Sequence, residues 1–380
     1  MDRYSQKLAA RLPVAKLETD IYERSAKRFG IPLASGTALR SLGSDLAFAR
    51  LLREADADLV HLPNHHLARY GLFLSQPYLV TVHDLIRYFD LNGLGPYIHR
   101  PNVRDRICLS LDYAGIRRAV ALIAVSETTK RDLCAHLGVA EERVFVVYAG
   151  VDHAVFRPLG VPPPLPDPYV LFVGSEHPRK NVATVLRAFA SLKRDARFAE
   201  LKLLKVGRAG GGGKFRVRTL AALGELGLER DVVFREDISD EELAASYSNA
   251  VCLVLPSLYE GFGLPPLEAM ACGCPVVVST AGSLPEIAGD AALLVDPRDT
   301  GGLANAVRRI IGEEGTRKEL IERGLRRAGE FSWERAARET TAVYEAVSKG
   351  LVPGVTATSR AGRSAQDGLR SDARGEVGCD

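Results

Sequence analysis

The sequence contains no long hydrophobic run and has little cysteine, methionine or tryptophan. Its six cysteines are dispersed, and the only close pair, Cys272 and Cys274, lacks the CxxC spacing of a zinc or redox motif. A disulfide framework is therefore not expected, and the composition fits a reducing cytoplasm. No stretch of about 18 apolar residues could cross a bilayer, and the first residues lack the apolar core of a secretory signal. We expect a cytoplasmic protein without a transmembrane helix.

Charge of either sign is not in large excess. The 380 residues carry a net charge of +3, and 46% are hydrophobic and 26% charged, as in a globular protein of two or three domains. Residues 1–160 hold 21 Lys and Arg against 17 Asp and Glu, whereas the remainder holds 29 against 30. The small excess of positive charge in the first half could favour binding to the anionic inner face of a membrane, or it could belong to an ordinary solvated surface. Both interpretations stay open.

A proline cluster divides the chain. Residues 161–168 contain five prolines, which fix φ and lack an N–H, so this segment predicts a stiff linker between a domain at 1–160 and a domain at 169–330. Beyond the linker, short apolar runs alternate with helical patterns. We predict strands at 169–173, 201–206, 232–234, 251–255, 275–278 and 292–295. Helices are predicted at 182–193, after the glycines 210–213 to about 226, at 240–247 and at 264–271.

The first half repeats this rhythm less clearly, with strand candidates at 59–62, 78–82, 121–125 and 144–147. Strands separated by helices predict parallel sheets. The expected fold is therefore α/β, with two doubly wound, Rossmann-like domains facing each other across a cleft. Ligands of such sheets lie beyond the carboxyl ends of the strands, so the cleft is the expected site. Residues 351–380 are rich in Gly, Ser, Arg and Asp and predict a disordered tail.

The densest candidate site is the segment Glu260–Glu268, between a predicted strand and a predicted helix. Gly261 and Gly263 permit close backbone approach. At a helix start, an anion cradle would form from the backbone N–H groups of Phe262, Gly263 and Leu264. Two carboxylates beside such a cradle suit a ligand that has both phosphates and hydroxyl donors, such as a nucleotide sugar. The alternative is a plain strand–loop–helix connection with surface glutamates.

A second candidate site is the segment Gly174–Asn181, which follows the first predicted strand of the second domain. Its adjacent cations, Arg179 and Lys180, could neutralise a diphosphate leaving group in place of a metal ion. The alternative is a helix-initiating loop with solvated charges.

A third candidate is His83, which with Asp84 follows the predicted strand at 78–82. Its ring could hydrogen-bond a sugar hydroxyl or polarise an acceptor, although a lone histidine equally suits a structural role.

Patterns that could ligate a metal ion are weak. Asp56 and Asp58 form a DxD pattern, but it precedes a predicted strand instead of following one. A proline separates His61 from His65 and His66, which argues against one helical face. We expect no metal site.

These motifs resemble those of the family 4 retaining glycosyltransferases, which have the GT-B fold. The segment Glu260–Glu268 resembles the E-x7-E motif of that family. The resemblance covers about residues 40–348, is specific in the second domain and looser in the first, and includes the segments 83–85, 125–127, 178–181, 269–277, 282–286 and 331–334.

The resemblance implies a role for each candidate residue. Glu260 would contact hydroxyls of the transferred sugar, Glu268 would bind the ribose, and His83 would lie beside the sugar. Arg179 and Lys180 would stabilise the leaving diphosphate without a metal. The donor would also contact the backbone of Gly174, Gly261, Phe262, Gly263 and Leu264, and its base would lie near Asp237 and Ile238.

The resemblance also implies a reaction. A hexose would pass from a nucleotide-diphosphate sugar to a glycan or lipid-linked acceptor with retained configuration, while the departing phosphate helps to deprotonate the acceptor. GDP-mannose is the first expectation for the donor and UDP-glucose the second, and no cofactor or nucleic acid is expected. The helix at 331–350 would cross back to the first domain, and the protein could sit at the inner face of the membrane.

Two departures from the family pattern bear on this expectation. Ser175 stands where many relatives carry an arginine, so Arg179 and Lys180 would carry the phosphate charge alone. Relatives begin with a strand and a Gly-Gly loop, whereas Met1–Ser5 resembles the helix that follows them, so the first domain is expected to lack its N-terminal strand. Two other functions stay open: a GT-B sugar-nucleotide epimerase, which needs no acceptor, and a non-catalytic nucleotide-sugar-binding protein.

Overall fold

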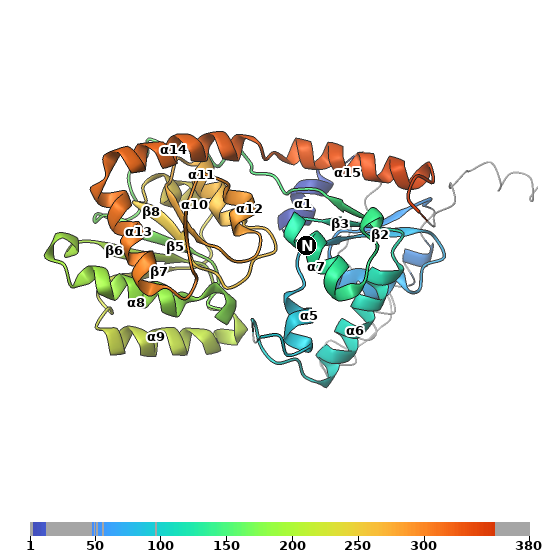
Figure 1. Cartoon of the computed structure of the whole chain (residues 1–380), viewed down its shortest axis with the longest axis horizontal. Helices are drawn as coiled ribbons and strands as arrows, with labels where there is room; N and C mark the ends of the chain where they lie inside the picture. The colour runs from blue at the N-terminus through green and yellow to red at the C-terminus, as the bar shows by residue number, and fades with distance from the viewer. Residues whose placement is uncertain are drawn as a thin grey trace, which may run out of the picture.

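The computed structural model describes residues 3–12, 48, 50, 52–54, 57–95 and 97–353, which form two lobes along the long axis of the molecule (Figure 1). Each lobe contains a parallel sheet with helices against it. Asp56 of the DxD pattern and residues 354–380 of the predicted tail lie outside the described residues. No helix in the described part of the chain is long and apolar enough to cross a membrane.

The first lobe is built on four parallel strands in the order β1-β2-β3-β4. All four predicted strands are confirmed to within one residue at each end. Every residue of β2 and β3 is buried, which explains their continuous apolar sequences. The elements of this lobe are α1 (Arg3–Ala9), β1 (Val60–Leu62), α4 (Ala68–Gly71), β2 (Tyr78–Val82), α5 (Ile86–Leu91), α6 (Val103–Arg118), β3 (Ala121–Ala124), α7 (Glu127–Leu137) and β4 (Val144–Val146).

The second lobe is built on six parallel strands in the order β10-β9-β8-β5-β6-β7. The chain starts at β5 in the middle, adds β6 and β7 on one side and then β8 to β10 on the other, so the strand order reverses between β5 and β8. The strands are β5 (Tyr169–Val173), β6 (Lys202–Val206), β7 (Val232–Arg235), β8 (Cys252–Leu255), β9 (Val276–Ser279) and β10 (Leu293–Val295). The predicted strands and helices of this domain are confirmed.

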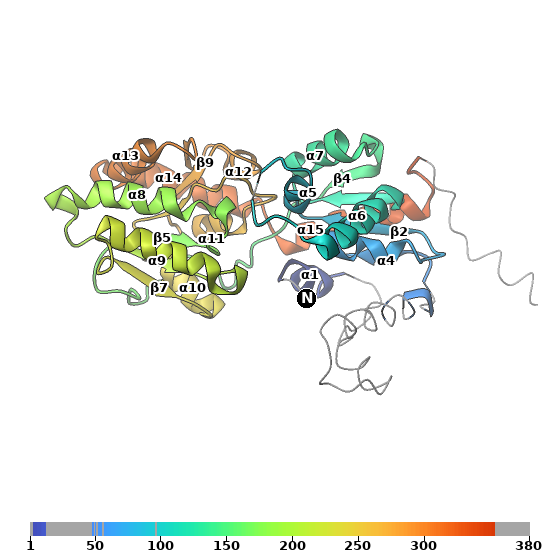
Figure 2. The same ribbon diagram turned by 90° about the horizontal axis from the view of Figure 1, so that it is seen from below.

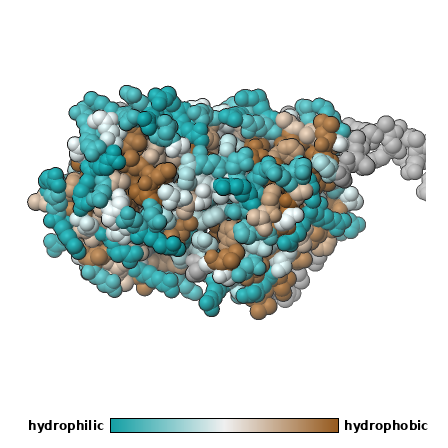
Figure 3. Space-filling view, in the orientation of Figure 1, coloured by the Kyte–Doolittle hydropathy of each residue, from teal (hydrophilic) through white to brown (hydrophobic). Residues whose placement is uncertain are grey.

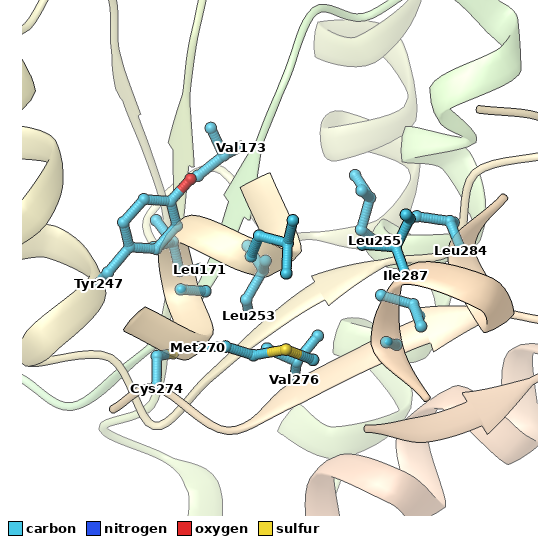
Figure 4. Close-up of a cluster of buried hydrophobic side chains, with 14 of the residues drawn as sticks. Leu171, Val173, Tyr247, Leu253, Leu255, Met270, Cys274, Val276, Leu284 and Ile287 are labelled. Carbon is cyan, nitrogen blue, oxygen red and sulfur yellow. The ribbon is translucent and has the colours of Figure 1, made fainter. Parts of the chain in front are cut away.

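Helices cover both faces of the second sheet (Figures 1 and 2). They are α8 (Val182–Lys193), α9 (Lys214–Leu226), α10 (Asp240–Ser248), α11 (Leu264–Ala271), α12 (Leu284–Ala288), α13 (Thr300–Gly312) and α14 (Glu314–Gly329), and α15 (Trp333–Ser348) follows. Figure 4 shows how Met270 of α11 and Ile287 of α12 pack with Leu253 and Val276 of the sheet, all at most 1% exposed. Each such side chain contributes about 1.5–3 kcal/mol by burial, so this cluster fixes the helices that begin at the candidate site.

Helix α15 lies against the first lobe, beside the sheet that contains β2 and β3 (Figure 1). Tyr344 of α15 hydrogen-bonds His61 of β1 through its hydroxyl at 2.6 Å, and the other ring nitrogen of His61 is 2.8 Å from the Thr81 hydroxyl. Burial, and less so the nearby His83, lowers the pKa of His61 to about 3. Its ring is therefore neutral, so one ring nitrogen donates to a hydroxyl and the other accepts from one.

The proline segment 161–168 has neither helix nor strand, and it lies against the second lobe. The amide of Asn249 donates to the carbonyl of Val161 at 3.3 Å, and the guanidinium of Arg235 donates to that of Pro164 at 3.0 Å. The boundaries at residues 160 and 168 stay a prediction.

Candidate active site

Two loops meet where the strand order of the second sheet reverses, which is where doubly wound sheets hold their ligands. The loop after β5 begins at Gly174, whose φ of 151° favours glycine. Arg179 and Lys180 follow on one short 3-10 turn, and α8 starts after the left-handed Asn181. The amide of Asn181 donates to the carbonyl of Pro256 at 2.9 Å, which ties this loop to the loop after β8.

The two loops are joined by a buried ionic cluster around Glu260. The Arg179 guanidinium lies 2.6 Å from Oε2 of Glu260, and the Lys180 ammonium lies 2.7 Å from Oε1. The Ser257 hydroxyl also donates to Oε1, at 2.7 Å. Glu260 and Lys180 are each 7% exposed. Arg179 and Lys180 of one predicted motif and Glu260 of another therefore form one contiguous site.

Burial and charge act against each other in this cluster. Burial alone would raise the pKa of Glu260, but Lys180 and Arg179 outweigh it and lower that pKa to about 2. Burial lowers the pKa of Lys180, and Glu260 opposes that effect only in part. At neutral pH the carboxylate is thus ionised and faces two cations, which leaves the cluster one positive charge in excess.

The cluster has hydrogen-bonding capacity left over. Nε of Arg179 is buried and has no hydrogen-bond partner among the described residues. An ionised carboxylate offers about four acceptor sites, and Glu260 uses three of them, two on Oε1 and one on Oε2. An unpaired guanidinium N–H and a remaining acceptor site suit a ligand with both an anionic oxygen and a hydroxyl donor.

The glycine loop between Glu260 and α11 leaves backbone N–H groups unpaired at the N-terminus of α11, among the described residues. Gly263 precedes α11 with φ 122° and ψ 55°, a conformation that other residues rarely adopt. No backbone carbonyl of the described residues accepts from the N–H groups of Phe262, Gly263 or Leu264. Ser283 fixes the backbone of Glu260, because the Glu260 carbonyl accepts from the Ser283 N–H at 3.1 Å and from its hydroxyl at 3.0 Å.

Glu268 lies inside α11, apart from the ionic cluster. Its side chain is buried, and its Oε2 accepts from the hydroxyl of Tyr247 on α10 at 3.1 Å. Burial and then this carboxylate raise the pKa of the tyrosine, which stays protonated as the donor. The ribose-binding role of Glu268 remains a prediction.

Asp237 and Ile238 follow β7, the outermost strand on their side of the sheet. The Asp237 carboxylate accepts from Arg208 at 2.6 Å, and its side chain is 62% exposed. One further strand, β6, separates β7 from β5, so these residues do not join the ionic cluster. Their predicted role beside the base is untested by this arrangement.

His83 follows β2, and its backbone carbonyl lies against Gly261 of the second lobe. Its Nε2 lies 3.0 Å from the carbonyl of Pro63, which only accepts, so this nitrogen carries a proton. The backbone N–H of His83 donates to Nδ1 of His65 at 3.3 Å. Burial, and then the neighbouring histidines, hold the pKa of His65 well below its usual value, so that ring is neutral and accepts.

The glycine loop touches the first lobe directly. A Cβ on Gly261 would lie 1.9 Å from the carbonyl oxygen of His83, so only glycine permits this approach. The carbonyl of Gly261 accepts from the hydroxyls of Ser126 at 2.7 Å and Thr129 at 3.3 Å, at the start of α7. The lobes are therefore closed on each other at this point.

A second contact between the lobes involves Glu286 of α12. Its carboxylate accepts from the backbone N–H groups of Glu127 at 2.7 Å and Thr128 at 3.1 Å, and from the Thr128 hydroxyl at 3.1 Å. A side chain of one lobe thus satisfies the first N–H groups of a helix in the other. Residues 125–127 and 282–286 were recognised as family segments, but no role was predicted for either.

Sequence reasoning also missed Ser257. Ser257 lies three residues before Glu260, and in a tight loop a hydroxyl at this spacing can reach the carboxylate. This spacing was the signal available in the sequence. Among the described residues there is no group of three or more His, Cys, Asp and Glu side chains that could hold a metal ion.

Two family models match the chain. Glycosyltransferase Family 4 matches residues 9–155, and Glycosyl transferases group 1 matches residues 161–327. The MMP alpha-(1->4)-mannosyltransferase of Mycolicibacterium hassiacum is 36% identical over 79% of this chain and 74% of its own length. The O-antigen chain mannosyltransferase B of Escherichia coli is 36% identical over 47% of this chain and 45% of its own length. For several relatives the match spans only a third to a half of their length.

Solved structures resemble the chain in fold. Sucrose-phosphate synthase from Thermosynechococcus elongatus has a TM-score of 0.67 and 26% identity, over 81% of this chain and 78% of that one. Anabaena HepE in complex with UDP-glucose has a TM-score of 0.67 and 18% identity, over 85% and 88%. Together with two Rossmann-like domains that meet at Gly261, these matches establish the predicted GT-B fold. The chain belongs to glycosyltransferase family 4 and is a glycosyltransferase.

Proposed function

We propose that this glycosyltransferase transfers mannose from GDP-mannose to a glycan or lipid-linked acceptor, with retained configuration and without a metal ion. The observation that carries the proposal is the ionic cluster of Arg179, Lys180 and Glu260 at the reversal of strand order. The names of the mannosyltransferase relatives support the choice of sugar. UDP-glucose is the second candidate donor.

The excess positive charge of the cluster supports the departure of a diphosphate. Arg179 and Lys180 are fixed by Glu260 before any ligand arrives, so they need little reorganisation as negative charge develops on the leaving group. The Nε–H of Arg179 and the N–H groups at the start of α11, which have no partner among the described residues, would add donors for an anion. Two fixed cations, one of them balanced by Glu260, would thus stabilise the leaving diphosphate in place of a metal ion.

The proposed step exchanges one bond at the anomeric carbon for another on the same face. The bond from C1 to the β-phosphate oxygen breaks, and its electrons leave with GDP. A bond forms from C1 to the acceptor oxygen, whose proton passes to the departing phosphate. Glu260 would accept a hydrogen bond from a hydroxyl of the mannose at its remaining site on Oε2, and Nδ1 of His83 would accept from another.

A melting-temperature screen against GDP, UDP and ADP, each with and without magnesium, tests the donor class. A nucleotide at a hundred times its Kd adds about 2.7 kcal/mol to the free energy of unfolding. We expect the largest rise with GDP and no change on adding magnesium. A larger rise with UDP would replace the donor, and a rise that requires magnesium would contradict the metal-independent mechanism.

Product analysis by proton NMR tests the reaction. Incubation with GDP-α-mannose and mannoside acceptors should give an α-linked product and one GDP per linkage. A β-linked product would contradict retention. Conversion of the donor sugar without an acceptor would indicate the epimerase instead, and binding of GDP without turnover towards any acceptor would indicate a protein that only binds the nucleotide sugar.

A further inference from the structure

One face of α6 exposes a row of apolar side chains. Val103, Ile107 and Leu111 are 75%, 58% and 42% exposed, and they lie four residues apart on one stripe of this 16-residue helix. Leu94, in the loop before α6, is 56% exposed. Helix α6 lies at the surface of the first lobe (Figure 2), and Figure 3 shows hydrophobic surface along the lower edge of that lobe. We call this surface the α6 face.

Positive charge surrounds the α6 face. Residues 92–118 contain five arginines and two aspartates. Both aspartates are already paired, since Asp105 lies 3.6 Å from Arg87 and Asp112 is buried 3.0 Å from Arg69. Arg87 is shared, since it also pairs with Asp90 at 2.7 Å. Residues 87–118 together hold six arginines and three aspartates, so the surface around the apolar stripe is basic on balance.

A cavity of about 410 Å³ opens beside the stripe. Arg100 and Arg106 line it, together with the loop residues Asn92, Gly93 and Gly95. Asp90 also lines the cavity, but its carboxylate is taken by Arg87 at 2.7 Å and the Tyr97 N–H at 2.7 Å. Two arginines in a hollow without an unpaired acid suit a phosphate group.

The same loop reaches the candidate active site. The carbonyl of Tyr97 accepts from the N–H of Arg179 at 3.0 Å, and the Tyr97 ring lies 5.9 Å from that of Tyr259, the residue before Glu260. The loop that lines the cavity therefore also contacts the segments that hold the ionic cluster.

We infer that the α6 face docks on an anionic lipid bilayer, with a lipid phosphate between Arg100 and Arg106 and the apolar stripe in the headgroup region. Apolar side chains and flanking arginines act together in such binding, because neither gives stable attachment alone. The inference rests on the proposed function and narrows its acceptor to a lipid-linked molecule, which would reach the cleft from the membrane surface.

Sedimentation with vesicles tests the inference. The full chain is mixed, without nucleotide, with vesicles of phosphatidylcholine alone or of equal parts phosphatidylcholine and phosphatidylglycerol. We expect binding to the mixed vesicles only. The double variant Arg106→Glu with Ile107→Ser should bind more than about tenfold more weakly, since it loses one apolar group and reverses one charge.

Helix α14 supplies a matched control on the opposite edge of the molecule (Figure 1). It also has 16 residues and carries an adjacent exposed pair, Leu325 and Arg326. The double variant Leu325→Ser with Arg326→Glu should bind vesicles as the parent does. Circular dichroism melting of both variants checks that each is folded.

Three results would overturn the inference. The parent could fail to bind the mixed vesicles, both double variants could lose binding equally, or the chain could be a dimer in sedimentation velocity that only the α6 variant dissociates. The last result would assign the face to a second copy of the chain. The rise in melting temperature with GDP is measured on the same samples, so that a wrong membrane face is distinguished from a wrong donor.

Discussion

The replacement Lys180→Ala removes one of the two cations that hold Glu260. The Nζ of Lys180 lies 2.7 Å from Oε1 of Glu260, and the side chain is buried. A cation from the solvent therefore cannot replace it in the variant. The loss of one preorganised charge-stabilising donor lowers kcat by about 10²–10³, or about 2.7–4 kcal/mol. We expect a fall of about a hundredfold in kcat, because Arg179 remains beside the diphosphate and continues to supply one charge.

The same replacement also affects folding, and the two effects have to be separated. Breaking a buried ion pair costs about 3–5 kcal/mol when the remaining charge has no other partner. Glu260 keeps Arg179 at 2.6 Å and the Ser257 hydroxyl at 2.7 Å, so we expect a smaller loss, about 2 kcal/mol in the free energy of unfolding. Most of the enzyme therefore stays folded at 25 °C, and kcat can be measured on it.

A second lysine of the same lobe supplies the control. Lys193 ends α8, and its Nζ lies 3.0 Å from Asp231, which precedes β7 at the opposite edge of the sheet from the cluster. Lys193→Ala should lower stability without changing kcat. The assay follows GDP release with GDP-mannose and the best mannoside acceptor, and urea unfolding gives the stability of each variant. A kcat for Lys180→Ala within about threefold of the parent would refute the assigned role, since that is less than 1 kcal/mol.

Three further predictions follow from the contacts at the cleft. Gly261→Ala should lower kcat/KM by more than about tenfold while the melting temperature barely changes, because a Cβ 1.9 Å from the His83 carbonyl forces the lobes apart; unchanged kinetics would contradict this. Glu286→Gln should lower kcat/KM about fivefold, because the negative charge that faces the N-terminus of α7 is removed. An equal fall in kcat/KM for Glu127→Gln, which keeps that contact, would mean a general charge effect. Burial lowers the pKa of Lys180 below the usual lysine value of 10.5, so the enzyme should lose activity at a pH below 10.5, as the ammonium loses its proton. Lys180→Arg should move this loss of activity to higher pH. A loss at the same pH in both proteins would assign it to another group.

The fold was predictable because its signals are local. The strand at 169–173 and the helix at 182–193 are fixed by apolar periodicity and by the glycine and prolines around them, and the structure has both with the same bounds. Alternation of such units implied parallel sheets, and each sheet is parallel throughout. No pattern within either domain states how the two domains sit against each other, so that arrangement came from the resemblance alone.

The site was predictable only in part. Arg179, Lys180 and Glu260 were recognised as candidates, but their direct contact depends on β5 and β8 being neighbours, and strand order is not a local property of the sequence. Ser126 and Glu286 were missed as contacts for the same reason, because their partners lie more than 130 residues away along the chain.

The contact at Gly261 sets a condition on the catalytic cycle. Its carbonyl is held by Ser126, and its Cα side lies against the His83 carbonyl, which leaves no room for even a methyl group at that position. We therefore expect the lobes to separate before a hexose enters between Glu260 and His83. The contacts that must break are hydrogen bonds, each with a net stabilisation of about 0.5–1.5 kcal/mol, and the packing of the Tyr259 ring against Phe89 and Tyr97 of the first lobe. Hydroxyls of the bound sugar would then replace these bonds, and closure over the occupied site would exclude water from the reacting carbon.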